Sequence, residues 1–279
     1  MRGALLIATL LVACGPSNKP GSGIDANGTG DGPPGTIDAP GSTGPDGSNL
    51  MTSVYAHTSD TLYRVDPDTF AVTQIAPFGW PSSVGSDQMT DIAVDKNGQM
   101  IGVSYSRVYR VDTATAQATL LSSSLQGMFN GLSFVPAAQV GGTGDDVLVG
   151  SRNTDGKIFR IDTTTGAATQ VGDMGHGYMS SGDIVSVVGL GTVATVTTGT
   201  GNDILVKLAP NTFDATPIGT DTGFSQLWGI GFWKDKVFAF SDDGSFVLID
   251  KNTGVGTLQQ ASGQAWWGAA VTTLAPVIN

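Results

Sequence analysis

Glutamate is absent from the 279-residue sequence: all 24 acidic residues are Asp, against 13 Lys and Arg. Helices draw heavily on Glu, Lys, Leu and Ala, whereas this sequence contains 40 Gly and is dense in Thr, Ser and Val. The composition therefore argues against a helical protein and predicts an all-β fold with many turns.

Basic residues are scarce, and the formal net charge is -11. Electrostatic capture of nucleic acid or of an anionic membrane surface needs clustered Lys and Arg, so both kinds of partner are disfavoured. Hydrophobic residues make up 40% of the chain, which is enough to bury a sizeable core. We expect a folded monomer that does not bind nucleic acid.

Cysteine occurs once, at Cys14, so no disulfide can form within the chain. Arg2 and the ten-residue apolar run 3–12 precede it, and that run is too short to cross a bilayer as a helix. These features predict a signal peptide over residues 1–13. The plainer alternative is an ordinary secretory signal followed by an unrelated cysteine.

The segment Leu11-Val12-Ala13-Cys14 resembles the lipobox of bacterial lipoproteins. This resemblance implies cleavage after Ala13 and attachment of fatty acyl chains such as palmitate to Cys14, and two or more chains anchor a protein stably in a lipid bilayer. Gly15 rather than Asp follows the cysteine, which in Gram-negative members favours the outer membrane. The implied location is the cell envelope, on its periplasmic or surface face.

The next segment has the composition of a linker. Residues 15–50 contain 10 Gly and 6 Pro and almost no apolar side chains. Such a segment cannot bury a core. We therefore divide the chain into a signal peptide (1–13), a lipidated cysteine with a disordered linker (14–50) and a folded domain (51–279).

One motif recurs five times in the folded domain. An apolar run ends in Asp, or in Ala in the fourth copy, and Thr follows three residues later. The copies end at Asp66, Asp112, Asp162, Ala209 and Asp250, with spacings of 46, 50, 47 and 41 residues. The Asp side chain can accept hydrogen bonds from the following amides and close a turn. The residue after Thr is Gly in two copies and Phe70, Ala116 or Phe213 in the others, so we expect the turn geometry to vary.

Four short strands surround each copy of the motif. In the second repeat they are expected at 89–95, 99–105, 107–112 and 117–122, and in the third at 129–135, 146–151, 157–162 and 167–172. Four strands in about 45 residues predict one blade of a β-propeller. The first repeat has strands only at 53–57, 61–66 and 71–76, and segment 265–275 supplies the missing inner one. The sequence thus predicts a five-bladed propeller closed by pairing of its N- and C-terminal strands.

The strand-Asp-x-x-Thr-(Gly) repeat resembles those of bacterial secreted propellers in the quinoprotein-like and YVTN-type group. The shared residues are turn formers and core, so the resemblance implies architecture rather than function. Five-bladed glycosidases of similar architecture use a Glu general acid, which this chain lacks. Quinone-dependent dehydrogenases of this kind usually have eight blades, so both activities are disfavoured.

Large side chains cluster before the expected inner strands, at one end of the channel. They form a candidate ligand-binding rim, because Trp and other large apolar groups bury much area in few rotamers. The alternative is that they plug a narrow channel. The candidates are Met89, Phe129, Trp228, Trp266 and Trp267, with Gln88, Gln226 and Gln264 beside them.

Asp91 and Asp183 occupy equivalent positions in inner strands and are candidate Ca²⁺ ligands. The alternative is that they cap strand-entry turns, and we expect no other cofactor. The two histidines, His57 and His176, fall in loops without any recognisable catalytic motif. We expect both to be surface residues without a role, and no catalytic residue is assigned.

These features favour a lipid-anchored binding module for a glycan, a peptide or another envelope partner. One alternative is an enzyme of lactonase or lyase type that uses Asp91, Asp183 and a rim histidine. Another is a structural component of an envelope assembly. An enzyme needs carboxylates or histidines that converge on one cavity, whereas a binding module needs exposed aromatic side chains.

The anchor is tested by the Cys14→Ala substitution. Without the thiol no lipid can be attached, so the protein should move from the membrane fraction to the soluble fraction in cells that make bacterial lipoproteins. Fractionation followed by immunoblotting measures this shift. Unchanged membrane association of the variant would count against the lipobox interpretation.

Overall fold

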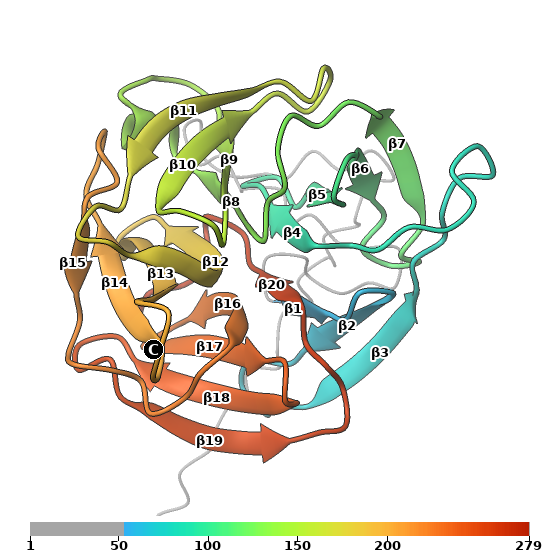
Figure 1. The fold of residues 1–279 in the computed structure, drawn as a ribbon. Coiled ribbons are helices and arrows are strands. Elements are labelled where there is room, and N and C mark those ends of the chain that lie inside the picture. Colours follow the sequence, from blue (N-terminus) through green and yellow to red (C-terminus); the bar gives the residue numbers. More distant parts are fainter. Residues whose placement is uncertain (1–52, 279) are drawn as a thin grey trace, which may run out of the picture. The chain divides into compact units, whose positions relative to one another are not determined.

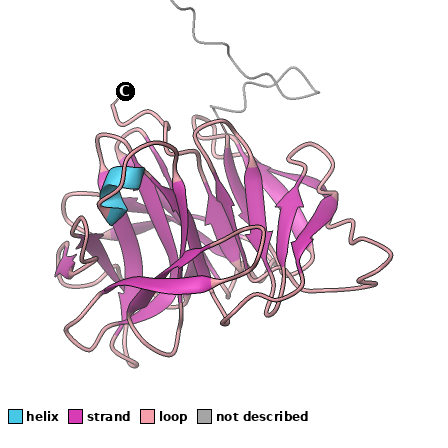
Figure 2. Ribbon diagram, turned by 90° about the horizontal axis from the view of Figure 1, so that it is seen from above, coloured by secondary structure: helices cyan, strands magenta, loops and turns pink. Residues whose placement is uncertain are grey.

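Twenty β-strands form five four-stranded antiparallel sheets arranged around a central axis (Figure 1). They belong to a computed structural model that describes residues 53–278; the expected signal peptide, Cys14 and the linker lie outside these residues. The strands run from one face of the ring to the other (Figure 2). The predicted all-β, five-bladed propeller is confirmed.

Blades 2 to 5 are each a meander whose first strand lies at the channel. Blades 2 and 3 follow the sequence prediction closely, with every strand slightly shorter than expected or shifted by a residue. Blade 2 contains β4 (Asp91–Val94), β5 (Met100–Val103), β6 (Val108–Val111) and β7 (Ala118–Ser122), and blade 3 contains β8 (Gly131–Val135), β9 (Val147–Ser151), β10 (Lys157–Ile161) and β11 (Ala168–Asp173).

Blades 4 and 5 have longer inner strands, and both inner strands contain an irregularity in their pairing. Blade 4 contains β12 (Met179–Val187), β13 (Gly191–Thr197), β14 (Ile204–Leu208) and β15 (Ala215–Pro217), and blade 5 contains β16 (Leu227–Trp233), β17 (Lys236–Ser241), β18 (Ser245–Asp250) and β19 (Gly256–Ala261). Within residues 53–278 one short 3-10 helix, η2 (Ala137–Val140), interrupts the β-structure between β8 and β9.

Blade 1 joins the two ends of the domain, as the sequence predicts. Its outer strands come from the N-terminal side and its inner strand from the C-terminal side: β1 (Val54–His57), β2 (Thr61–Val65), β3 (Val72–Pro77) and β20 (Gly268–Ala270). β20 pairs antiparallel with β1, with Ala269 opposite Ala56 and Gly268 opposite His57. Only three residues of the expected segment 265–275 belong to the sheet.

The residues after β20 cross the face of the ring opposite the loops that enter the inner strands. Thr272 donates a hydrogen bond to Asp95 O in blade 2 (2.9 Å), and Thr273 donates to the Asp146 carboxylate beside blade 3 (2.7 Å). On the other side Val188 N donates to Thr273 O and Lys234 N to Pro276 O. This C-terminal segment, residues 271–277, therefore bonds to the four other blades and covers that end of the channel.

The five repeat turns share one backbone geometry, so the expectation of variable turns was wrong. The residue after Thr adopts a left-handed φ of 57° to 74° in every copy: Phe70, Ala116, Gly166, Phe213 and Gly254. Its amide donates to the carbonyl of the residue at the Asp position in all five turns. Phe213 and Ala116 are buried in the interior, and Phe70 packs on Phe238 of blade 5, so tertiary packing offsets the cost of this conformation.

In four of these turns the Asp side chain accepts backbone hydrogen bonds, as the motif predicts. In the first turn Asp66 Oδ1 accepts hydrogen bonds from the amides of Asp68 (3.0 Å) and Thr69 (2.8 Å). Asp112, Asp162 and Asp250 do the same in their own turns. These bonds lower the pKa of Asp66, first through the amide of Thr69. Four of the 24 aspartates are thus used to close these turns.

Glycines let the inner strands of neighbouring blades approach closely. A Cβ at Gly182 in β12 would overlap the backbone of Trp228 in β16, and a Cβ at Gly229 would overlap the backbone of Gly268 in β20. No part of the described chain forms a helix long and apolar enough to cross a membrane.

The Gly229→Ala substitution tests this packing. Its methyl group would meet backbone atoms that cannot move without disturbing the closing blade, so we expect a loss of about 2 to 3 kcal/mol in the free energy of unfolding. Gly263→Ala is the matched control, because Gly263 has no atom within 4 Å of the new methyl position. The control should change stability by less than about 0.5 kcal/mol. Equal thermal unfolding of both variants would contradict the close approach.

Candidate functional site

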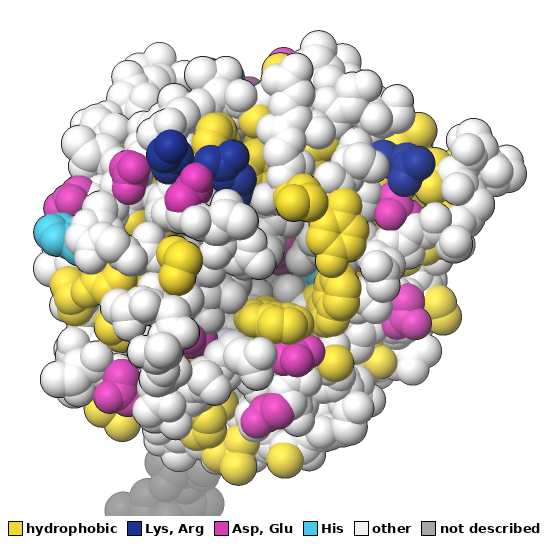
Figure 3. Space-filling model, in the orientation of Figure 1, with side chains coloured by type: hydrophobic (Ala, Val, Ile, Leu, Met, Phe, Trp, Pro, Cys, Tyr) yellow, Lys and Arg dark blue, Asp and Glu magenta, His cyan; other side chains and the backbone are white. Residues whose placement is uncertain are grey.

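A pocket of about 250 Å³ opens at the mouth of the channel, on the face where the chain enters the inner strands. All five blades contribute to it. Figure 3 shows the hollow in the middle of this face, with hydrophobic side chains around it and acidic and histidine side chains at its bottom. The lining residues are Thr90, Tyr105, Met128, Phe129, Asn130, Asn153, Ser181, Trp228 and Trp267.

Two tryptophans from neighbouring blades dominate the mouth. The rings of Trp228 and Trp267 are 6.4 Å apart and nearly perpendicular, at 87°. Leu227 pairs with Ser241 and Gly229 with Phe240, which leaves Trp228 as the extra residue of a bulge in β16. Bulges commonly redirect a side chain, and this one directs Trp228 into the pocket. Tyr105 and Met128, 50% and 61% exposed, complete an apolar rim.

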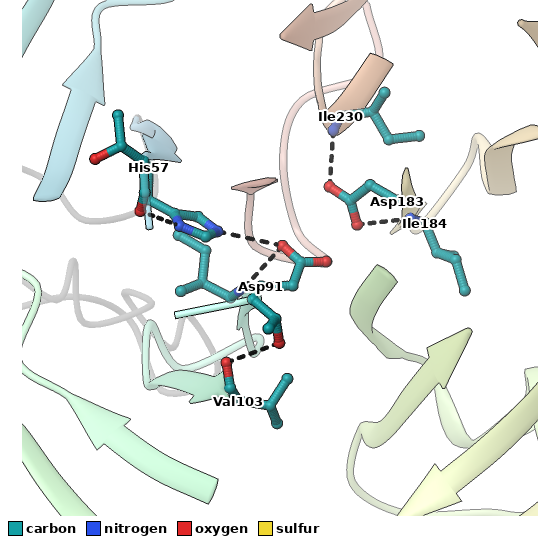
Figure 4. Close-up of polar contacts among 9 residues, drawn as sticks. His57, Asp91, Val103, Asp183, Ile184 and Ile230 are labelled. Atoms are coloured by element: carbon teal, nitrogen blue, oxygen red, sulfur yellow. Dashed lines mark hydrogen bonds and ion pairs between the residues drawn. The ribbon is translucent and has the colours of Figure 1, made fainter. Parts of the chain in front are cut away.

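Below the pocket lie three fully buried titratable side chains, His57, Asp91 and Asp183, which we call the channel cluster. His57 Nε2 is 3.6 Å from Asp91 Oδ1, and Asp91 lies between the other two (Figure 4). Asp91 and His57 adjoin the pocket lining. Asp91 follows Thr90 in the chain, and the carbonyl oxygen of His57 accepts a hydrogen bond from the amide of Trp267 (2.8 Å).

Backbone amides hold the two carboxyl groups in place. Asp183 accepts hydrogen bonds from Ile184 N (2.6 Å) and from Ile230 N in the next blade (2.7 Å), and Asp91 Oδ1 accepts one from Ile92 N (2.8 Å). Asp183 also sits in a bulge, where residues 181–183 of β12 oppose Thr195 alone. The bulge brings the carboxyl group to the channel.

Glycine makes room for this cluster. The positions equivalent to Asp91 and Asp183 in the other three inner strands are Gly131, Gly229 and Gly268. A Cβ at Gly268 would overlap both Asp91 Oδ1 and His57 Nε2. Two carboxyl groups therefore fit inside the channel because no side chain competes for the same space.

Burial controls the protonation of the cluster. It raises the pKa of Asp91 well above its usual range, and the neighbouring charge of Asp183 raises it further. Burial also raises the pKa of Asp183, while the amides of Ile230 and Ile184 oppose that change. The pKa of His57 is lowered to about 4, because desolvation disfavours the imidazolium.

Several buried atoms near the channel have no hydrogen-bond partner. They are His57 Nε2, Asp91 Oδ2 and Asn130 Oδ1. His57 Nδ1 lies 2.8 Å from Thr58 O, so it carries the proton and Nε2 is left as an acceptor. Unsatisfied buried polar atoms are uncommon and often mark a place where something else binds.

Only some residues of the predicted rim line the pocket. Phe129, Trp228 and Trp267 line the pocket, whereas Met89 is fully buried and Trp266 packs in the core against Tyr63 and Phe240. Gln88 and Gln226 are exposed outside the pocket lining. Gln264 lines a different cavity of about 120 Å³, next to Tyr63.

The expectation for His57 was wrong. It is a fully buried channel residue at the end of β1, because the strand continues through it and pairs it with Gly268. His176 does lie at the surface, in the loop before β12, with Nε2 3.3 Å from Asp214 Oδ1. Sequence reasoning also missed Asn130, although its position directly before an inner strand matches that of Thr90.

The candidate Ca²⁺ ligands Asp91 and Asp183 do lie close together. However, no group of three or more His, Cys, Asp or Glu side chains within residues 53–278 is arranged to hold a metal ion. Among residues 53–278, therefore, no third His, Cys, Asp or Glu side chain joins Asp91 and Asp183 to complete the predicted Ca²⁺ site.

No protein-family model matches the chain, and no curated protein matches it either. Solved structures match its fold. A symmetrical protein from a study of de novo evolutionary emergence under folding constraints aligns with a TM-score of 0.50 and 15% identity, over 81% of this chain and 99% of the other. A chain of the nidogen/laminin complex aligns with a TM-score of 0.51 and 9% identity, over 78% and 97%.

TolB from Acinetobacter baumannii aligns with a TM-score of 0.46 and 14% identity, over 77% of this chain and 54% of TolB. At these identities the likeness extends to the fold alone. The chain is an all-β propeller, and function has to be inferred from its own site.

The protonation of His57 is testable by NMR. With a pKa of about 4, its imidazole should stay neutral with the proton on Nδ1 at pH 6. Because an unfolded histidine binds a proton near pH 6.5, His57 should also lower the stability of the fold as the pH falls from that value towards 4. Nitrogen-15 shifts of the imidazole, assigned with a His57→Gln variant, measure the pKa, and a value of 6 or higher would contradict the buried position.

Proposed function

We propose that the protein is an interaction module that binds its ligand in the channel-mouth pocket. The observation that carries this proposal is the convergence of all five blades on one pocket, with Trp228 and Trp267 at its mouth. The C-terminal segment 271–277 covers the opposite end of the channel. A concave apolar pocket with a few polar groups is the usual form of a ligand site.

The size of the pocket limits what enters it. About 250 Å³ is enough for one ring or one amino-acid side chain, and a small ligand site typically spans roughly 300 to 1,000 Å³. A glycan or peptide partner would therefore insert one terminal group here. Tyr105 and Met128 at the rim would contact the part that stays outside.

We further propose that Cys14 anchors the protein at the cell envelope. The Leu11-Val12-Ala13-Cys14 motif, which resembles a lipobox, supports such an anchor.

A lactonase- or lyase-type enzyme is the second candidate function. It is favoured by the proximity of His57 to Asp91 (3.6 Å) and of Asp91 to Asp183, because acid–base catalysis needs such groups together. All three side chains are fully buried, and no Ser, Thr or Tyr hydroxyl among residues 53–278 is bonded to His57 as a nucleophile would be to its base. Binding is therefore the first candidate.

Ligand-observed NMR with the purified full-length protein tests the binding function. The panel would contain monosaccharides, amino-acid amides, short peptides and alkylamines. Compounds that bind should lose at least about tenfold in affinity in Trp228→Ala and Trp267→Ala, since a Trp anchor commonly contributes 2 kcal/mol or more. New product signals would instead favour the enzyme.

Leu258→Ala is the control, because Leu258 is 51% exposed on the outer strand β19 and far from the lining residues. It should bind as the unmodified protein does. Binding that survives both Trp substitutions, or no binding by any compound, would overturn the proposed site.

A further inference from the structure

The unpartnered polar atoms of the channel are mainly hydrogen-bond acceptors. The unpartnered buried atoms next to the pocket are Asn130 Oδ1, Asp91 Oδ2 and His57 Nε2. Asn130 Oδ1 and His57 Nε2 are acceptors, the latter because Nδ1 carries the proton of the neutral ring, and Asp91 Oδ2 becomes one when a neighbouring cation ionises the carboxyl group. The complement of such a set is a group that brings donors and needs no acceptor.

Two hydroxyl groups of the lining also offer only acceptors. Thr90 Oγ1 donates to Val103 O (3.1 Å), and Ser181 Oγ donates to the Asp203 carboxylate (2.6 Å). Their protons are therefore already used, and only oxygen lone pairs remain for a ligand.

The electrostatics of the site favour positive charge. No Lys or Arg is among the lining residues, and the two carboxyl groups of Asp91 and Asp183 lie directly below. The faces of Trp228 and Trp267 would attract a cation and would also pack against an alkyl chain. Figure 3 shows that this hollow reaches acidic side chains at its bottom.

We propose that the channel takes a primary ammonium group on an alkyl chain, from a small amine or a lysine side chain. The ammonium carries three N–H donors and no acceptor, so it would satisfy Asn130 Oδ1, Asp91 Oδ2 and His57 Nε2. The alkyl chain would lie between Trp228 and Trp267. This ligand class rests on the proposed function, since it occupies the same pocket.

Isothermal titration of the full-length protein with matched pairs tests the ligand class. The probes are 1-butylammonium against 1-butanol, and acetyl-lysine amide against acetyl-norleucine amide. Hydrogen bonds to charged groups contribute about 1.5 to 3 kcal/mol, so each amine should bind at least about tenfold more tightly than its neutral counterpart. Tetramethylammonium, which carries the charge but no N–H donor, should bind more weakly than 1-butylammonium.

Asp91→Asn is the deciding variant. It keeps an oxygen to accept the Ile92 amide but cannot ionise beside a bound ammonium, so amine affinity should fall about tenfold while the neutral probes are unaffected. If thermal unfolding shows that this variant is not folded, Asn130→Ala replaces it, with the same expected direction. Leu258→Ala should bind every probe unchanged.

The outcomes separate the two proposals. Neutral probes that bind as tightly as the amines, and lose affinity in Trp228→Ala, would overturn the ammonium site and leave the binding pocket intact. No binding by any probe would count against both. If acetyl-lysine amide binds more tightly than 1-butylammonium, the result supports the site and favours a lysine side chain as the ligand. The reverse order supports the site and favours a small amine.

Discussion

The pairing of β20 with β1 is the contact on which the rest of the structure depends. It joins Gly268–Ala270 to Val54–His57 across nearly the whole length of the domain. A ring closed in this way has no free inner edge. The C-terminal segment 271–277 then bonds to the four remaining blades and covers one end of the channel. Without this closure the five blades would share neither a channel nor a pocket.

Closure also determines what the channel can contain. Glycine at positions 131, 229 and 268 lets the inner strands approach, and it leaves room for the side chains of Asp91 and Asp183. Burying two carboxyl groups is costly unless backbone amides satisfy them. Here Ile92, Ile184 and Ile230 supply those amides, while Asp91 Oδ2 remains without a partner. The fold thus holds acceptors in place beneath an aromatic mouth.

The repeat architecture could be predicted from the sequence because it depends on local signals. The spacing of the Asp-x-x-Thr turns and the short apolar runs predicted the strands of blades 2 and 3 nearly to the residue. The common geometry of the five turns was missed, since Phe70 and Phe213 adopt a left-handed φ only because neighbouring blades bury or contact their rings. The conformational preference of a residue in the sequence does not show that packing against a neighbouring blade will offset the cost of a left-handed φ.

The site was predictable only in part. Phe129, Trp228 and Trp267 could be placed near the mouth, because the start of each inner strand was known. The bulge in β16 that directs Trp228 into the pocket has no clear sequence signal. The burial of His57 depends on its pairing with Gly268, which is distant in the chain. Met89 and Trp266 share the same strand-entry positions and yet pack in the core. Which side of an inner strand faces the channel is decided by register.

Hydrogen exchange measured by mass spectrometry tests the closed ring most directly. If β20 completes blade 1, the amides of Gly268–Ala270 and Val54–His57 should exchange as slowly as those of the inner strands β4 and β12, and all should lose protection in one cooperative step. Fast exchange of β20 while β4 and β12 stay protected would contradict closure by the two termini, and with it the shared pocket.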